Sequence, residues 1–161
     1  MQLAVTGHRL DKLGGYSPIV FDALVEFAGH MLKSYKPTKV ITGMALGWDQ
    51  AVAKACCQLN VPYLAAVPFV GQDNKWPKAW RLIYLDLLYR AKEQVIVCQG
   101  DYASWKMQRR NEWMVDNCDC LIALWDGTNS GTKNCVTYAQ NREKKIELLW
   151  DNWLMFRQKK F

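Results

Sequence analysis

Apolar residues along this chain fall into two patterns, and each pattern predicts a different element. Short, mostly apolar runs bounded by turn residues are typical of strands buried on both faces of a sheet. We expect strands at residues 3–5, 39–42, 63–67, 94–98, 120–125 and 146–149. Between these runs, apolar residues recur every three or four positions, which predicts amphipathic helices. We expect helices at about residues 17–36, 49–59, 77–92, 102–117 and 131–143.

The alternation of strands and helices predicts an α/β fold with a mainly parallel sheet of about five to six strands and helices on both faces. Right-handed crossovers place the loops that follow successive strands along one edge of such a sheet. No linker, repeat or low-complexity stretch divides the chain, so we expect a single domain over residues 1–161 with a core of about 2–149. Residues 150–161 are expected to form a basic, aromatic C-terminal tail.

The composition favours a folded cytoplasmic protein. Apolar residues make up 50% of the 161 residues, yet no run approaches the roughly 18 apolar residues that a membrane span needs. The six cysteines include no CxxC pair, and the two histidines are not at zinc-binding spacing to them. We therefore expect reduced, buried thiols and no metal site. The net charge of +6 fits an anionic ligand and also allows nucleic-acid binding.

Small and polar residues gather where several of the expected strands end. These segments are Thr6–Arg9, Gly43–Asp49, Pro68–Gln72 and Asp126–Thr132. Because the carboxyl ends of parallel strands share an edge, we expect the four segments to converge on a ligand crevice. Small residues between a buried strand and a helix leave backbone N–H groups at a helix N-terminus, where phosphate and other anions bind.

Motifs of several common enzyme classes are absent. The chain has no Walker A GxxxxGK[ST] spacing and no GxGxxG after its first strand, which argues against a P-loop ATPase and an ordinary NAD dehydrogenase. Two interpretations remain open for several polar residues. Asp49 contacts a ribose hydroxyl, caps its own helix, or does both. Arg110 and Asn111 face the crevice or solvent, and each tryptophan stacks on a base or, more commonly, packs in the core or at an interface.

Five segments keep a recognisable order along the chain: Thr6–Arg9, Thr42–Asp49, Val67–Phe69, Arg110–Asp116 and Asp126–Thr132. Together they resemble the SLOG superfamily over about residues 2–149, and above all its YpsA-like branch, which is related to the DprA and LOG (lysine-decarboxylase-like) proteins. The resemblance implies a Rossmann-like fold and a pocket for a nucleotide or a nucleotide-derived ligand, such as an NAD fragment or an ADP-ribose-like signal. It also implies a homo-oligomer that requires no further cofactor, from a bacterium or a phage.

The LOG enzymes of this superfamily cleave the base from a nucleoside monophosphate, and they carry a PGGxGTxxE motif whose Glu assists catalysis. In this chain Cys135 stands at the position of that Glu. A thiol that is not strongly acidified does not replace a carboxylate beside an oxocarbenium-like centre. The resemblance therefore favours a sensor or sequestering protein. A nucleotide N-glycosidase is the alternative, and a DprA-like binder of single-stranded nucleic acid is the second alternative.

Gly131 and Thr132 are expected to hold phosphate, with Asp49 on the ribose side. The full set of expected ligand-binding residues is Thr6, Gly7, His8, Arg9, Gly43, Met44, Ala45, Gly47, Asp49, Pro68, Phe69, Arg110, Asn111, Asp126, Gly127, Ser130, Gly131 and Thr132. A binding protein needs no catalytic residue. For the enzymatic alternative, Asp126 or Glu112 is the candidate replacement for the missing carboxylate.

Overall fold

The computed structural model describes all 161 residues as one sheet of six strands with seven helices. The strands are β1 (Gln2–Gly7), β2 (Lys39–Thr42), β3 (Tyr63–Val67), β4 (Glu93–Ile96), β5 (Cys120–Leu124) and β6 (Lys145–Leu148). The helices are α1 (Leu10–Leu13), α2 (Pro18–Tyr35), α3 (Trp48–Leu59), α4 (Lys78–Arg90), α5 (Ser104–Asp116), α6 (Gly131–Asn141) and α7 (Trp150–Lys160). None of the helices combines the length and the apolar character needed to span a membrane.

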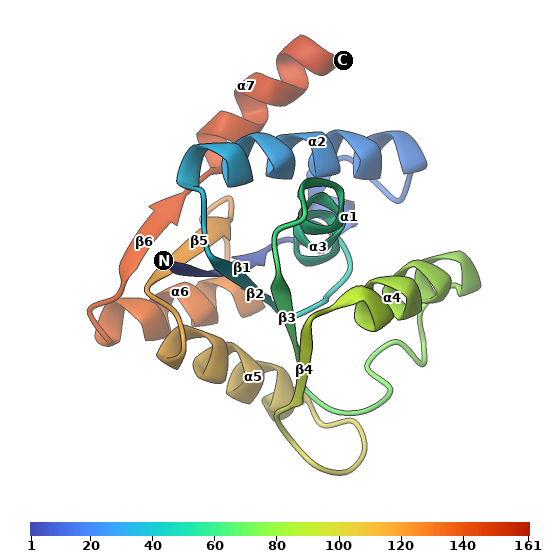
Figure 1. The fold of residues 1–161 in the computed structure, drawn as a ribbon, viewed down its shortest axis with the longest axis vertical. Helices are drawn as coiled ribbons and strands as arrows, with labels where there is room; N and C mark the ends of the chain where they lie inside the picture. The colour runs from blue at the N-terminus through green and yellow to red at the C-terminus, as the bar shows by residue number, and fades with distance from the viewer.

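The predicted α/β fold class is confirmed. All neighbouring strands pair in parallel, in the order β4-β3-β2-β1-β5-β6. The chain moves outward from β1 through β2 and β3 to β4, and then returns to the other side of β1 to form β5 and β6 (Figure 1). In open α/β sheets a ligand crevice lies outside the carboxyl ends of the strands, where the strand order reverses. Here that point lies between β1 and β5.

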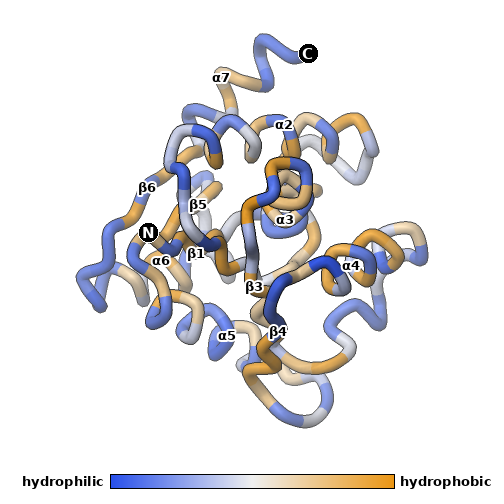
Figure 2. Tube along the Cα trace, viewed as in Figure 1, coloured by the Kyte–Doolittle hydropathy of each residue, from blue (hydrophilic) through white to orange (hydrophobic).

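The sheet separates two apolar cores because successive side chains of a strand point to opposite faces. Leu3, Val5 and Ile122 belong to the larger core, which α2, α3 and α7 cover. Ala4 and Leu121 belong to the smaller core, which α5 and α6 cover. Figure 1 shows these two groups of helices on opposite sides of the sheet. In Figure 2 hydrophobic and hydrophilic residues alternate along the helices, as expected for helices with one face on a core.

The C-terminal segment is the main difference from the expected extent of the core. The structure forms α7 there, and Trp153 is completely buried in the larger core. Its ring centroid lies 5.5 Å from that of Phe27 on α2. A second difference is α1, a four-residue helix without a side-chain cap. Such a short helix produces no repeated apolar spacing in the sequence, so periodicity does not predict it.

We expect Trp153→Ala to lower the free energy of unfolding by about 3–5 kcal/mol, because it leaves a large cavity in the core. Met155→Ala on the same helix is the matched control, since Met155 is 60% exposed, and its effect should stay within about 0.5 kcal/mol. Urea unfolding of the three proteins measures both values. Equal, small effects of the two substitutions would show that α7 does not contribute to the core.

Candidate functional site

A cavity of about 300 Å³ lies at the carboxyl edge of the sheet, where β1, β2 and β5 end. Its walls come from the end of β1, from α1, and from the first turns or the first half of α3, α5 and α6. The lining residues are Thr6, Gly7, His8, Arg9, Asp11, Lys12, Ala45, Asp49, Met107, Arg110, Asn111, Ser130, Gly131 and Thr132. Most of the residues expected to bind a ligand are therefore brought together. Asp11, Lys12 and Met107 were not expected.

The N-terminus of α6 presents free backbone donors to this cavity. Ser130 is the N-cap, and its hydroxyl accepts a hydrogen bond of 3.2 Å from the amide of Lys133. The amides of Gly131 and Thr132 find no acceptor in the protein. Since the helix dipole adds partial positive charge at this end, these two amides form an anion-binding position.

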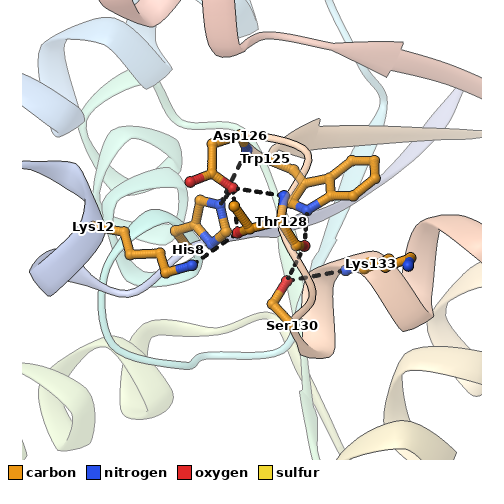
Figure 3. A network of polar contacts seen from close by, with 7 residues as sticks. All are labelled: His8, Lys12, Trp125, Asp126, Thr128, Ser130 and Lys133. Carbon is orange, nitrogen blue, oxygen red and sulfur yellow. Dashed lines mark hydrogen bonds and ion pairs between the residues drawn. The ribbon is translucent and has the colours of Figure 1, made fainter.

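The loop between β5 and α6 is held in place by hydrogen bonds that converge on Thr128 (Figure 3). The Thr128 amide donates to Asp126 Oδ1 over 3.0 Å, and the Thr128 hydroxyl donates to the same oxygen over 2.5 Å. Lys12 Nζ donates to the Thr128 hydroxyl over 2.8 Å, and Trp125 Nε1 donates to the Thr128 carbonyl over 2.7 Å. The start of α6 is thus positioned before any ligand binds.

His8 joins the end of β1 to the same loop. Its Nε2 lies 2.8 Å from Asp126 Oδ1 and 3.0 Å from the Asp126 amide nitrogen. A protonated Nε2 donates to the carboxylate, whereas a bare Nε2 accepts from the amide, so either tautomer holds the loop. Burial raises the pKa of Asp126, but hydrogen bonds from Thr128 and His8 outweigh it and hold that pKa well below its ordinary value. Asp126 is therefore an ionised loop anchor, and it does not line the cavity.

Arg110 explains why Gly43 follows β2. Its guanidinium Nη1 donates to the carbonyl oxygens of Gly43 and Ala66, the latter over 3.2 Å. A Cβ on Gly43 would lie 2.6 Å from this guanidinium, so only glycine allows the approach. Burial lowers the pKa of Arg110, opposed by the charge of Asp49; an arginine nonetheless remains protonated at neutral pH. Gly43 supports Arg110 and, contrary to the prediction, does not line the cavity.

Gly47 and Met44 also have packing roles in place of the expected ligand contacts. Gly47 has a φ of 103°, and a Cβ there would lie 2.6 Å from the His8 carbonyl oxygen. The amide of Trp48 donates to that carbonyl over 3.3 Å, which joins the start of α3 to the end of β1. Met44 is completely buried in the larger core. Neither Gly47 nor Met44 lines the cavity.

The loop after β3 meets the loop after β2, where Gln72 Nε2 donates to the Gly43 carbonyl over 3.3 Å, but it does not line the cavity. Pro68 and Phe69 are buried, and the Phe69 ring packs against Tyr102 at a centroid distance of 5.9 Å. The Nζ of Lys106 lies 5.8 Å from the same ring. Gly127, in the loop after β5, also lies outside the cavity wall. Pro68, Phe69 and Gly127, which were expected to bind the ligand, therefore do not line the cavity.

Glu112, an expected candidate for catalysis, is on the wrong side of α5. Two residues along a helix correspond to a rotation of about 200°, so Glu112 points away from Arg110. It lies in a separate surface hollow together with Trp113 and Tyr138. None of the eight tryptophans lines the cavity. Seven of these rings pack in or against a core, whereas Trp105 is 60% exposed. Glu112 has no access to the site.

Asp49 carries the least satisfied polar group in the cavity wall. Its side chain is buried; Oδ2 accepts from the Ala45 amide over 3.3 Å, and Oδ1 has no hydrogen-bond partner. Burial raises its pKa to about 6, although Arg110, the Ala45 amide and Arg9 act to lower it. Gly47 occupies the N-cap position of α3, so the capping interpretation of Asp49 is wrong. The ribose-hydroxyl interpretation remains a prediction.

Cys135 has no catalytic character. It is completely buried in the smaller core. Burial raises its pKa to about 12, although a hydrogen bond with Thr6 and the charge of Arg110 act to lower it. The thiol is therefore neutral at physiological pH, and it supplies no negative charge to the cavity. All six cysteines are free, and five of them are buried, as predicted.

Comparisons with known proteins agree with this architecture. The model of the YspA SLOG family (YpsA) matches residues 3–152. The uncharacterized SPbeta prophage-derived protein YoqJ of Bacillus subtilis is 32% identical over 136 residues, which cover 74% of this chain and 79% of YoqJ.

Two solved structures share the fold. DprA from Streptococcus pneumoniae superposes with a TM-score of 0.65 at 18% identity, over 91% of this chain and 49% of DprA. The chain thus spans about half the length of that protein. The molybdenum cofactor carrier protein of Chlamydomonas reinhardtii superposes with a TM-score of 0.57 at 13% identity, over 91% of this chain and 74% of the carrier.

The buried carboxyl of Asp49 predicts a pH-dependent stability. Its pKa is 3.8 when unperturbed and about 6 in the folded protein, so the folded state holds a proton that the unfolded state has lost between these values. Stability therefore falls as the pH rises through this window, by up to about 3 kcal/mol from this group. We expect the stability of Asp49→Asn relative to the wild type to increase by about 2 kcal/mol between pH 4 and pH 7.5, because part of the effect is already present at pH 4.

Urea unfolding at the two pH values measures this difference. Asp11→Asn, at an exposed carboxyl on the rim of the same cavity, should change the pH dependence little. A difference between Asp49→Asn and the wild type that stays constant with pH would refute the assignment of a raised pKa.

Proposed function

Because the chain belongs to the YspA SLOG family, we propose that it binds a phosphorylated, nucleotide-type ligand in the cavity between the ends of β1, β2 and β5. The observation that carries the proposal is the N-terminus of α6, whose Gly131 and Thr132 amides face this cavity without acceptors. Two unpaired amides at the positive end of a helix dipole are suited to a phosphate group.

The charges in the cavity wall support the same ligand class. Arg9, Lys12 and Arg110 bring three cationic side chains, against the carboxyl groups of Asp11 and Asp49. Burial disfavours the charged form of Asp49, which adds to the positive balance. An anionic ligand is therefore favoured over a neutral or cationic one.

The size of the cavity favours a small nucleotide. Its volume of about 300 Å³ lies at the lower end of the range of roughly 300–1,000 Å³ that small-molecule sites occupy. A mononucleotide or a nucleotide fragment fits this volume better than an intact dinucleotide.

We propose that the protein senses or sequesters this ligand and does not cleave it. Cys135 provides a neutral, buried thiol where a cleaving relative carries its carboxylate. Asp126 uses one carboxylate oxygen to hold the loop, and Glu112 lies in another hollow. Neither of the two candidates for replacing the missing carboxylate therefore reaches the cavity, which is why the N-glycosidase alternative ranks second. Binding of single-stranded nucleic acid, self-association and a cytoplasmic location remain predictions from the sequence.

Gly131→Pro tests the proposal directly, because proline has no N–H yet suits the first position of a helix. The site tolerates it: the preceding residue Ser130 has an extended backbone with ψ 174°, and a Cβ on Gly131 would meet no atom within 4 Å. We expect the variant to fold normally and to bind AMP about 10- to 100-fold more weakly than the wild type, as for a lost hydrogen bond to a charged group.

Gly131→Ala is the matched control, since it adds the same Cβ and keeps the N–H. Its affinity for AMP should stay close to that of the wild type in isothermal titration calorimetry. Equal affinities of Gly131→Pro and Gly131→Ala would place the anion elsewhere. If neither AMP nor another phosphorylated nucleotide binds the wild-type protein, the proposed function is wrong.

A further inference from the structure

The cavity contains little that would recognise a nucleobase. Proteins usually hold a base by stacking it on an aromatic ring or by enclosing it in apolar side chains. The only apolar side chains in this cavity wall are Ala45 and Met107, and no Phe, Tyr or Trp residue contributes to it. The aromatic residues closest in sequence to the site are used elsewhere: Trp48 is completely buried in the larger core, and Trp125 donates its N–H to the loop carbonyl of Thr128.

The polar groups of the wall form two separate recognition points. One consists of the free amides at the start of α6, after β5. The other is the Oδ1 atom of Asp49, which is at the start of α3, after β2, and has no hydrogen-bond partner although the side chain is only 6% exposed. An unpaired, buried carboxylate oxygen is costly, which is a reason to expect a donor from a ligand.

The sheet gives the order of magnitude of the distance between these two points, because each lies a few residues beyond the end of a strand. Since β1 lies between β2 and β5, the two strand ends are two spacings apart, about 10 Å. A pentose 5-phosphate bridges such a span when its phosphate meets the amides and a ring hydroxyl meets the carboxylate.

The charges beside Asp49 determine what kind of donor fits. Arg110 and Arg9 both act electrostatically on its carboxyl group, and both line the cavity. A cationic donor on the ligand would be repelled by these two side chains, whereas a neutral hydroxyl would not. A second phosphate would be repelled by the carboxylate itself. A neutral donor satisfies both conditions, and in a ribosyl phosphate the hydroxyl groups of the sugar lie closer to the phosphate than the N–H groups of a base do.

We propose that this cavity recognises the ribose and the phosphate of its ligand and leaves the base unrecognised. The amides of Gly131 and Thr132 bind the phosphate, and Asp49 accepts a hydrogen bond from a ribose hydroxyl. The inference rests on the proposed function, and it adds that ribose 5-phosphate is the minimal ligand and that the four common bases are interchangeable.

Calorimetric titration of the wild-type protein with ribose 5-phosphate, AMP, GMP, CMP, UMP and adenosine tests this inference. We expect the affinities of ribose 5-phosphate and the four nucleotides to agree within about 10-fold, since a stacked base alone would add about that factor or more. Adenosine, which lacks the phosphate, should not bind measurably. Free ribose 5-phosphate and the nucleotides are titrated separately. The experiment therefore also shows whether the ribose phosphate group binds more tightly by itself or as part of a nucleotide.

A second comparison tests the role of Asp49. The wild-type protein should bind 2′,3′-dideoxy-AMP about 10- to 100-fold more weakly than AMP, because the carboxylate then has no donor. Asp49→Asn should bind the two nucleotides about equally. Asp22→Asn, which changes an exposed carboxyl on α2 outside this cavity, should keep the preference for AMP. The ligand comparison in the wild type needs no variant, so it stands even if Asp49→Asn folds poorly.

The outcomes separate the two proposals. If one nucleotide binds more than about 100-fold more tightly than ribose 5-phosphate, the base is recognised, and this inference fails while the proposed function stands. The same holds if wild-type protein binds AMP and 2′,3′-dideoxy-AMP equally, or if Asp49→Asn retains the preference. If no phosphorylated compound binds, both proposals fail.

Discussion

The guanidinium of Arg110 holds the carboxyl edge of this sheet together. It comes from α5, on the side of the smaller core, and it donates to the carbonyl groups of Gly43 after β2 and Ala66 in β3. A buried arginine must satisfy its donors and offset its charge, so the chain around it is constrained. Gly43 lacks a side chain to admit it, and the carboxyl group of Asp49 lies within its electrostatic influence. The Arg110 side chain thus connects α5 to the ends of β2 and β3, and it also contributes a positive charge to the cavity.

This arrangement determines which donors of the cavity wall are used within the protein and which are left for a ligand. Arg110 is already engaged by backbone carbonyls. The donors left for an anion are the amides at the start of α6, Arg9, and the N–H groups of Lys12 that Thr128 does not use. The loop before α6 is held by bonds from His8, Lys12 and Trp125 (Figure 3). A site whose donors are already ordered loses less conformational entropy when the ligand binds. This preorganisation suits the proposed role of the site, which is to hold its ligand.

The sequence allowed the elements and the edge of the site to be predicted, because both depend on local pattern. Buried strands read as short apolar runs, and parallel topology places their carboxyl ends together, so Thr6, Asp49 and Thr132 were expected at one place. The roles of Gly43 and Gly47 could not be predicted from local sequence pattern. Gly43 and Gly47 follow a strand as phosphate-binding glycines do, yet each makes room for a partner distant in sequence, the Arg110 side chain and the His8 carbonyl. Lys12 and Trp153 were missed for the same reason, since tertiary contacts define their environment.

We propose that α6 binds the phosphate of a ribosyl ligand between β1 and β5. A crystal structure of the protein grown with AMP tests this claim most directly. We expect the phosphate within hydrogen-bonding distance of the Gly131 and Thr132 amides, a ribose hydroxyl at Asp49 Oδ1, and a base that projects toward solvent. A nucleotide bound in the hollow beside Glu112 and Tyr138, or one with its base buried at Asp49 and its phosphate away from α6, would contradict the account.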